Sequence, residues 1–539
     1  MPTVLSSAFV ALVAYSSYKL AKFFYHQYTL PINHLPGPES KSWIFGNIKE
    51  IWLNDNSVVH EKWVASYGRT LKYKAMVGTT RLFTMDTKAL AHVLMHSHIY
   101  QKPEASRYFL SLIVGEGVLV AEGESHRQQR RVMNPAFGTL QIRELTEIFM
   151  DKAIELRDIW AAEVAQTDGE TRIDALSWLS RMTLDVIGLA GFNYRFDALS
   201  SDPEKNELNK AFSTLFKSES GVPLISFLRG VFPALRILPA ARDVQSKQAK
   251  KTMNRIGQQL MKDSKASLMA TKGGGTMDTT DKDPSRRRDL LTLLIRANMA
   301  TDLHHSQRMS DEDVLAQVPT FLVAGHETTS VGTAWALYSL TQYPDVQEKL
   351  RTELLTVSTD NPTMDDLNAL PYLDAFVRET LRVHAPVPSS IREATQDDVI
   401  PLEHPVKDEQ GNLQHYVRVT KGQTIFIPIL AINRSKDIWG EDAHDFKPER
   451  WQSIPEAATS IPGVWGNQLT FLGGTRACIG YRFSLVEMKA LLFTLVRAFE
   501  FQLAVPANEI KKKSNVVQRP VLVSDGKNQM PLLVKPYRA

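Results

Sequence analysis

The only cysteine of the chain, Cys478, lies in a segment that could supply a thiolate ligand. A single thiol cannot form an internal disulfide, build a Cys-rich zinc site or hold an iron–sulfur cluster. Gly474 and Gly480 allow tight turns on either side of it. An apolar helix is predicted from Ser484 to Phe499, so its N-terminal amides and dipole could stabilise a thiolate. The alternative is a small buried hydrophobic residue, the more usual role of a lone cysteine.

Three polar residues of different chemistry, His326, Glu327 and Thr328, are consecutive in a mostly apolar stretch. The segment begins like the zinc-peptidase motif H-E-x-x-H, but its fifth position is Ser330, so the second metal ligand is missing. An acid beside a hydroxyl can instead relay protons. The alternative for Thr328 is a hydrogen bond to the carbonyl one turn back, which is common for a threonine inside a helix.

A long helix is predicted to position these polar residues. It begins with a capping signal at Ser310, followed at the third position by Asp313, and it continues to about Gln342, before Pro344. This length is roughly three times the mean for α-helices and is enough to cross a whole domain. Gly325 lies in the helix interior at a cost of up to about 1 kcal/mol relative to alanine. We therefore expect that a surface without a side chain is needed there.

The segment around the cysteine fits the pattern F-x-x-G-x-R-x-C-x-G at every fixed position, with Phe471, Gly474, Arg476, Cys478 and Gly480. Here the chain resembles the cytochrome P-450 superfamily, whose haem-binding loop has this pattern. The resemblance implies that the cysteine is the axial ligand of the iron of haem b and that the arginine pairs with a haem propionate. Thiolate ligation favours O–O cleavage in this family.

Two further motifs lie in the order that the family has. Glu379 and Arg382 resemble its E-x-x-R pair, and Arg450 resembles the arginine that completes a network with that pair. The implied role is structural, because losing one member of a buried ion network leaves uncompensated charge. Arg392 matches a position that often reaches a propionate in the family.

The middle of the long helix, Ala324 to Thr328, resembles the oxygen-activating motif A-G-x-[DE]-T of the same family. The resemblance implies that the glycine opens space for dioxygen. It also implies that Glu327 and Thr328 are catalytic and relay protons to the oxygen being activated.

The chain departs from the family at an early helix, where many members have W-x-x-x-R. His126 stands in place of the tryptophan, four residues before Arg130, and both could still bind a propionate. This departure, together with His326 in the long helix, is most similar to fungal members that act on specialised metabolites. The resemblance covers residues 30 to 539.

The stretch from Pro2 to Phe24 is mostly apolar, interrupted only by Lys19 and Lys22. Roughly 20 helical residues span a bilayer if lysines snorkel to the interface, so a retained transmembrane helix is predicted. A cleaved signal peptide would have its positive charge first, and an amphipathic surface helix would need a charged face. Basic residues after the span predict a cytoplasmic body, with the endoplasmic reticulum as the expected membrane. The expected organisation is an anchor over residues 1–28, a Pro-rich hinge over 29–40 and a catalytic domain over 41–539.

The composition predicts a predominantly α protein with small β-sheets, of the α+β class. Strand-like sequence occurs at Leu71 to Thr84 and at Tyr416 to Ile432, without an alternating βαβ pattern. The low-complexity stretch Thr271 to Arg288 is predicted to be a connection between helices. With 63 basic and 59 acidic residues, the net charge of +4 argues against nucleic acid as a partner.

The resemblance implies a monooxygenase that receives electrons from an NADPH-dependent flavoprotein reductase and oxidises a lipophilic small molecule, for which a terpenoid is our hypothesis. Arg130, Arg131 and Lys489 could dock an acidic partner, or could form a solvated helix face. The apolar segment Gly221 to Ala240 could admit a hydrophobic substrate from the bilayer, although core packing explains it almost as well. The rival functions are a haem-thiolate isomerase that needs no reductase and a membrane-anchored haem sensor.

Overall fold

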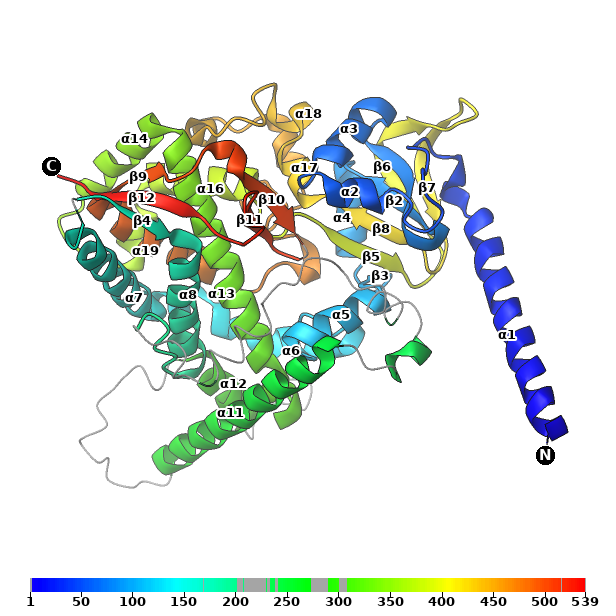
Figure 1. Cartoon of the computed structure of the whole chain (residues 1–539), viewed down its shortest axis with the longest axis horizontal. Helices are drawn as coiled ribbons and strands as arrows, with labels where there is room; N and C mark the ends of the chain where they lie inside the picture. The colour runs from blue at the N-terminus through cyan, green and yellow to red at the C-terminus, as the bar shows by residue number, and fades with distance from the viewer. Residues whose placement is uncertain are drawn as a thin grey trace. The chain divides into compact units, whose positions relative to one another are not determined.

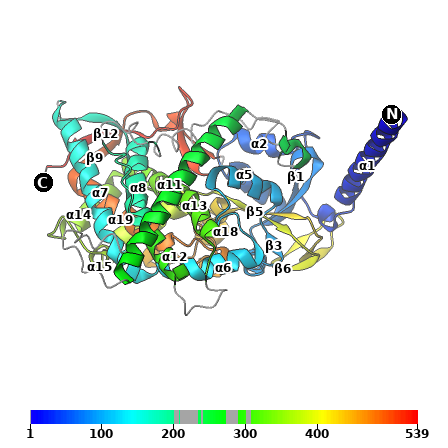
Figure 2. The same cartoon turned by 90° about the horizontal axis from the view of Figure 1, so that it is seen from below.

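The protein is described here by a computed structural model of the whole chain (Figures 1 and 2). It describes residues 2–167, 169–200, 207, 229, 233–237, 241–272, 289–299, 308–514 and 516–538. Most of the segment Gly221 to Ala240 and most of Thr271 to Arg288 therefore lie outside the described residues. The chain divides into a first unit, with residues 1–101, 389–435 and 457–476, and a second unit, with residues 102–388, 436–456 and 477–539.

A five-stranded sheet forms the centre of the first unit, with strand order β1-β2-β8-β5-β3. Its only parallel pair joins β2 to β8, and the other neighbours are antiparallel. The strands are β1 (Thr70–Lys74), β2 (Thr80–Thr84), β3 (Tyr100–Gln101), β5 (Ser390–Ala394) and β8 (Thr424–Ile427). A separate hairpin is formed by β6 (Asp398–Lys407) and β7 (Leu413–Val419). The helices are α1 (Pro2–Tyr28), α2 (Ile48–Leu53), α3 (Val58–Tyr67), α4 (Thr87–Met95) and α17 (Ile429–Asn433).

An aromatic core holds this unit together. Trp63 from α3 packs with Tyr73 and Phe83 from the sheet, and all three are almost completely buried. The ring of His60 stacks on Phe83 with centroids 5.4 Å apart. Burial lowers the pKa of His60 to about 4, so this histidine is a neutral core residue at physiological pH.

Helices form most of the second unit. They are α5 (Glu104–Val114), α6 (Gly123–Met133), α7 (Thr139–Ala165), α8 (Ala175–Phe192), α11 (Ala241–Lys272), α12 (Leu290–Met299), α13 (Asp311–Gln342), α14 (Pro344–Leu355), α15 (Met364–Asn368), α16 (Pro371–Val383), α18 (Lys436–Trp439) and α19 (Tyr481–Ala498). A sheet of order β4-β12-β9 and a hairpin β10-β11 complete the unit. These strands are β4 (Thr171–Asp174), β9 (Phe499–Leu503), β10 (Ile510–Ser514), β11 (Gln518–Leu522) and β12 (Pro531–Pro536). The prediction of a mainly helical protein with small sheets is confirmed.

Helix α13 is the long central helix that the sequence predicts, and it runs beside α8 among the other helices of the second unit (Figure 1). Ser310 caps it, and the side chains and amides of Ser310 and Asp313 form a reciprocal capping box. Its last residue is Gln342, because Pro344 has no amide hydrogen for the helical ladder and begins the next helix. Both predicted ends are confirmed to within one residue.

The predicted strand from Tyr416 to Ile432 is wrong in its last part. Strand β8 ends at Ile427, and the apolar residues after Pro428 form the short helix α17. Because α17 is buried throughout, it has no polar face from which a helical period could be recognised. The helix after the cysteine, α19, begins at Tyr481, three residues earlier than predicted.

At the N-terminus the structure has the helix α1, which covers the predicted anchor. Among the residues that the structure describes, however, none of the helices is both long and apolar enough to cross a membrane. The transmembrane helix therefore stays a prediction.

Candidate active site

Cys478 lies three residues before Tyr481, the first residue of the helix α19, in the second unit. Gly480 is the N-cap residue of that helix, and its backbone amide donates a hydrogen bond to the sulfur. Burial raises the pKa of the Cys478 thiol, whereas the amide of Gly480 and the charge of Arg130 oppose this rise. The side chain is nevertheless exposed on one face. The sulfur is therefore held by protein on one side and open on the other, as an axial ligand must be.

Arg130 reaches this loop from α6. Its Nη1 donates a hydrogen bond to the carbonyl oxygen of Ala477, at 2.7 Å, so the guanidinium lies beside the residue that precedes the cysteine. His126 lies one turn earlier on the same helix and is buried. His126, which replaces the tryptophan of the family's motif, and Arg130, which matches its arginine, are thus on one face of α6, and Arg130 contacts the cysteine loop.

Lys489 does not belong to a docking surface, and that prediction is wrong. The side chain is almost completely buried, and its Nζ binds Asp374 at 2.8 Å and Asn368 at 2.9 Å. An isolated buried ammonium would be costly, so the lysine is paired inside the protein. Its place on an apolar helix after the cysteine gave no signal of this pairing.

The middle of α13 has one open face. Ala324 is exposed and Thr328, one turn later, is half-buried, although the residues between and around them are mostly buried. The hydroxyl of Thr328 donates to the carbonyl oxygen of Ala324 at 2.7 Å. This is the local hydrogen bond that mid-helix threonines commonly make, and it holds the hydroxyl of Thr328 on the open face of α13.

The neighbouring helix α8 explains why residue 325 is a glycine. A Cβ atom on this glycine would lie 2.8 Å from the side chain of Ile187, closer than atoms can approach. On the next residue, the carbonyl oxygen of His326 accepts a hydrogen bond from Thr183 of α8 at 3.0 Å. The missing side chain therefore allows α8 and α13 to pack closely, a reason that the sequence alone did not reveal.

Glu327 is bound by two basic side chains. Nε and Nη2 of Arg519, on β11, donate to its Oε2 at 3.0 and 2.5 Å, and Nε2 of His326 lies 3.4 Å from its Oε1. Burial alone would raise the pKa of Glu327, but hydrogen bonds and charges from His326 and Arg519 overcome this and lower it to about 2. Sequence reasoning missed Arg519, because a strand arginine almost 200 positions away carries no local sign of its partner.

Glu379, Arg382 and Arg450 are brought together in the second unit. Arg382 is fully buried and binds Glu379 through Nε and Nη2, at 2.9 and 2.7 Å, while Nε of Arg450 lies 3.4 Å from the same carboxylate. Two partners were missed by sequence reasoning: Trp451, whose indole N–H donates to Glu379 at 3.1 Å, and Asp442, which accepts from Arg450 at 2.6 Å. Every charge in the network therefore has an opposite charge or a hydrogen bond.

The remaining predicted site residues lie in the first unit. Phe471 is buried with its ring against Trp465, and Gly474 has a φ of +67°, which favours glycine. A Cβ atom on Gly474 would also meet the carbonyl oxygen of Leu94 at 2.4 Å. Arg392, on β5, is buried and donates to the hydroxyl of Ser390 at 2.8 Å. Arg476 ends the segment that belongs to this unit.

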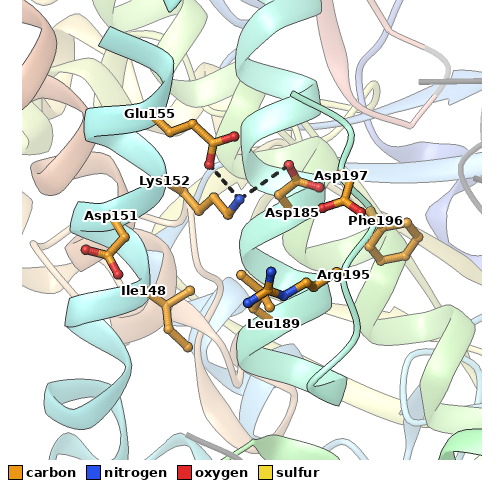
Figure 3. A pocket seen from close by; sticks show the side chains of 9 residues that line it. All are labelled: Ile148, Asp151, Lys152, Glu155, Asp185, Leu189, Arg195, Phe196 and Asp197. Atoms are coloured by element: carbon orange, nitrogen blue, oxygen red, sulfur yellow. Dashed lines mark hydrogen bonds and ion pairs between the residues drawn. The ribbon is translucent and has the colours of Figure 1, made fainter. Parts of the chain in front are cut away.

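A separate charged pocket of about 250 Å³ lies between α7 and α8 (Figure 3). In it Lys152 lies between Glu155, at 2.6 Å, and Asp185, at 3.9 Å. Asp185 also accepts hydrogen bonds from the amides of Ala198 and Leu199. Because none of the predicted site residues lines it, this pocket is a structural feature apart from the candidate site.

The donor set of the second unit fits haem. One thiol is held at a helix N-terminus with an open face, a half-buried arginine supports its loop, and a long helix presents an open face with a hydroxyl and an acid beside it. The clustered His, Cys, Asp and Glu residues that a metal ion without a porphyrin would need are absent from the described residues. A single thiolate is the ligand that haem of this type requires.

The chain is similar to known proteins over nearly its whole length. The cytochrome P-450 family model matches residues 36–524. Cytochrome P-450 monooxygenase 205 and monooxygenase 128 of Postia placenta are 57% and 53% identical over 537 residues, which are 99% and 98% of this chain and 98% and 97% of theirs. Monooxygenase claW of Ampulloclitocybe clavipes is 34% identical over 510 residues, 93% of this chain and 92% of its own.

The chain therefore belongs to the cytochrome P-450 family. It is a monooxygenase, an oxidoreductase whose cofactor is haem iron, and as a member of this family it works with a redox partner on lipophilic substrates.

Proposed function

We propose that this monooxygenase hydroxylates a lipophilic specialised metabolite, using electrons that an NADPH-dependent flavoprotein reductase delivers. The observation that carries the proposal is the open face of α13, where Ala324 and the hydroxyl of Thr328 are accessible and Glu327 lies beside them. A sensor or an electron carrier would need the thiolate but would have no use for a hydroxyl and an acid in this position.

Cys478 is the proposed axial ligand. His126, Arg130, Arg392 and Arg476 are the proposed partners of the propionates, and Phe471 and Gly474 shape the loop before the cysteine. Bound in this way, haem would supply the dioxygen chemistry, and a thiolate ligand would favour O–O cleavage. The network of Glu379, Arg382 and Arg450 has the proposed role of bracing the segment between α16 and α19.

Proton delivery is the proposed catalytic role of Glu327 and Thr328. Activating dioxygen consumes two protons, and a pocket built for lipophilic molecules contains little water to supply them. The hydroxyl of Thr328 can exchange its bond to the Ala324 carbonyl for one to the reacting oxygen, while Glu327 brings protons from the protein surface. Both residues act through their own side-chain atoms.

Substrate-dependent NADPH oxidation tests this proposal. The enzyme is reconstituted with a fungal reductase, screened against lipophilic extracts with terpenoids as the first class, and assayed by mass spectrometry for products that have gained one oxygen atom from ¹⁸O₂. We expect oxygen incorporation that requires both NADPH and reductase. Conversion of a peroxide without NADPH would support the isomerase instead, and no conversion of any extract would support the sensor.

We also propose that the chain is attached to a membrane by α1, as a single-pass protein of the endoplasmic reticulum with a cytoplasmic catalytic domain. Large apolar and aromatic side chains of α1 are exposed, among them Val10, Leu20 and Tyr25. Lys19 and Lys22 follow the more apolar turns, as expected for side chains that reach the interface. The anchor, hinge and catalytic domain are the proposed divisions at residues 28 and 40.

A further inference from the structure

The loop between α5 and α6, residues 115–122, is fastened to α13 by hydrogen bonds at both ends of one helical turn. The backbone N–H of Val118 donates to Oε1 of Gln317 at 2.9 Å. The hydroxyl of Thr320 donates to the carbonyl oxygen of Val114, the last residue of α5, at 2.8 Å. All four residues are buried. Because a buried N–H or carbonyl group that loses its partner is costly, these bonds hold the loop in one position.

The backbone of the loop lies directly on α13 at Gly117. A Cβ atom on this glycine would lie 2.6 Å from the carbonyl oxygen of Ala316 and 2.9 Å from Oε1 of Gln317, and it would overlap the hydroxyl of Thr320. No side chain can therefore be inserted between the loop and the helix at this point. The position of the loop depends on the polar groups that α13 presents to it.

The bond from Val118 is the first of a network of side-chain amides whose direction is fixed. Because the Val118 N–H can only donate, Gln317 must turn its oxygen towards the loop and its NH₂ group away from it. Nε2 of Gln317 donates to Oε1 of Gln129, on α6, at 3.3 Å and to the carbonyl oxygen of Asp313 at 2.8 Å. Nε2 of Gln129 in turn donates to Oδ1 of Asp313 at 3.4 Å. The network thus ties the loop to α6 and to the capping box of α13.

The fastened loop borders the open face of α13. Thr320, Ala324 and Thr328 follow one another at intervals of four residues, so they lie on one face of the helix. At a rise of about 1.5 Å per residue, Ala324 lies about 6 Å and Thr328 about 12 Å beyond Thr320 along the axis. Three apolar side chains in and before the loop are only partly buried, which leaves apolar surface for a lipophilic molecule: Leu112, Ile113 and Leu119.

We propose that Gln317 is a positioning residue for the substrate: by holding Val118 it fixes the 115–122 loop at the edge of the open face, and the fixed loop sets which lipophilic molecules reach Thr328. The proposal rests on the proposed function, in which oxygen is activated beside Thr328. Gln317 is only 1% exposed, so it acts through the loop and does not touch the substrate itself.

Ligand binding to the ferric holoenzyme tests this role without turnover. Imidazole and 4-phenylimidazole both bind haem iron through a nitrogen atom and shift the Soret band, but only the second carries an apolar group that extends beyond the iron. Gln317→Leu keeps a side chain of similar size and removes the partner of the Val118 N–H. We expect the Kd of 4-phenylimidazole to rise about tenfold, the factor for one buried hydrogen bond, and that of imidazole to change less than about twofold.

Gln347→Leu is the matched control. Gln347 is also a buried glutamine, and its Oε1 accepts from the backbone N–H of Phe501 at 3.0 Å, but it holds β9 in place of the loop. This variant should lose stability in thermal unfolding and keep the wild-type ratio of the two Kd values. Hydrogen exchange followed by mass spectrometry should become faster over residues 115–122 in Gln317→Leu and stay unchanged there in Gln347→Leu.

Two further variants separate the position of the loop from the general stability of the protein. Gly117→Ala pushes the loop away from α13 and leaves every hydrogen-bonding side chain in place, so it should change the ratio in the same direction as Gln317→Leu. Gln129→Leu removes the next amide of the network. Its effect should not add to that of Gln317→Leu in the double variant, because both substitutions break the same network.

The proposal is overturned if Gln317→Leu changes neither the ratio of the Kd values nor the exchange of the loop, or if Gln347→Leu changes the ratio equally. If Gln317→Leu holds too little haem for the titration, an unchanged ratio in Gly117→Ala has the same meaning. The two imidazoles bind without NADPH or reductase. These measurements would therefore remain valid even if the proposed monooxygenation of a metabolite failed.

Discussion

In the proposed relay, Thr328 has a structural and a chemical role at once. Its bond to the Ala324 carbonyl is 2.7 Å long, and the residue lies on the open face of α13. A hydroxyl in a closed core could only serve its own helix. This one can leave its carbonyl, because that oxygen keeps the backbone hydrogen bond of the helix when the side chain turns.

We expect Thr328→Ala to keep haem and to consume NADPH, but to release hydrogen peroxide in place of hydroxylated product. Without the hydroxyl, protons do not reach the oxygen in the correct position. The measurement is product formed per NADPH, with peroxide determined in parallel. Thr333→Ala, another hydroxyl of α13 that binds the carbonyl one turn back, at 2.9 Å, is the matched control and should remain coupled. Unchanged coupling in Thr328→Ala would refute the relay.

Cys478→Ser should lose the red-shifted Soret band of the ferrous carbon monoxide complex. The shift depends on a thiolate ligand, and a serine hydroxyl is a weaker donor that is not deprotonated at neutral pH. The absorption spectrum of the reduced variant under carbon monoxide gives the answer. As the chain has no other cysteine, a retained shift could not come from a second thiolate and would disprove the axial assignment.

At the scale of elements, the contact between α8 and α13 allows a quantitative prediction of stability. Gly325→Ala gains up to about 1 kcal/mol of helix propensity, but the new methyl group overlaps Ile187 at 2.8 Å, and overpacking costs about 1–3 kcal/mol. We expect Gly325→Ala to lose stability in thermal unfolding. The double variant Gly325→Ala with Ile187→Ala should recover the stability that the overlap costs. Gly191→Ala on α8, where the nearest side-chain atom is at 3.4 Å, should not destabilise. An additive double variant would show that the two helices are not in tight contact.

The ion network of Glu379, Arg382 and Arg450 should tolerate substitution much less well than the contact between α8 and α13. Glu379→Gln leaves the buried guanidinium of Arg382 without its carboxylate, while Arg450 keeps Asp442, and breaking a buried ion pair costs about 3–5 kcal/mol. We expect poor recovery of the holoenzyme and a lower unfolding temperature. Glu124→Gln removes an ion pair with Arg127 in which both side chains are exposed, and it should cost less than about 1 kcal/mol. Equal stability of both variants would contradict the structural role of the network.

The elements were predictable from sequence to different degrees, for physical reasons. The ends of α13 are set by local chemistry, a capping box and a proline, so they could be located closely. Helix α17 was misassigned because a segment buried on all sides has no amphipathic period. The role of the cysteine loop was predicted from its resemblance to the family's pattern F-x-x-G-x-R-x-C-x-G. Arg519 and the true environment of Lys489 were not, because pairs between distant segments depend on tertiary structure.

At the scale of the whole molecule, α1 and the first unit share defined contacts. The side chain of His26 lies 3.3 Å from the carbonyl oxygen of Lys421, and the carboxamide oxygen of Gln27 accepts from the amide of Thr80 at 2.9 Å. These bonds involve only the last turn of the helix. The preceding residues of α1 can therefore be removed without loss of these contacts.

Deleting residues 2–22 should release most of the protein from membranes and leave the carbon monoxide spectrum intact. This deletion keeps His26 and Gln27, so the first unit retains its contacts. Flotation of the full chain and the truncated chain with vesicles measures the difference. Unchanged flotation would exclude α1 as the anchor, and a mature N-terminus cleaved near residue 25 would replace the anchor by a signal peptide.

The single cysteine has a practical consequence for studying this enzyme. Every molecule carries one sulfur nucleophile, which is the proposed iron ligand and has one open face. A maleimide added to the native protein should alkylate only molecules that lack haem, since a coordinated thiolate is shielded. Intact-mass spectrometry would then show two peaks, with and without one adduct, whose ratio counts the loaded fraction of any preparation or variant. Alkylation of the single cysteine therefore reports the fraction of molecules that hold haem, without background from other thiols.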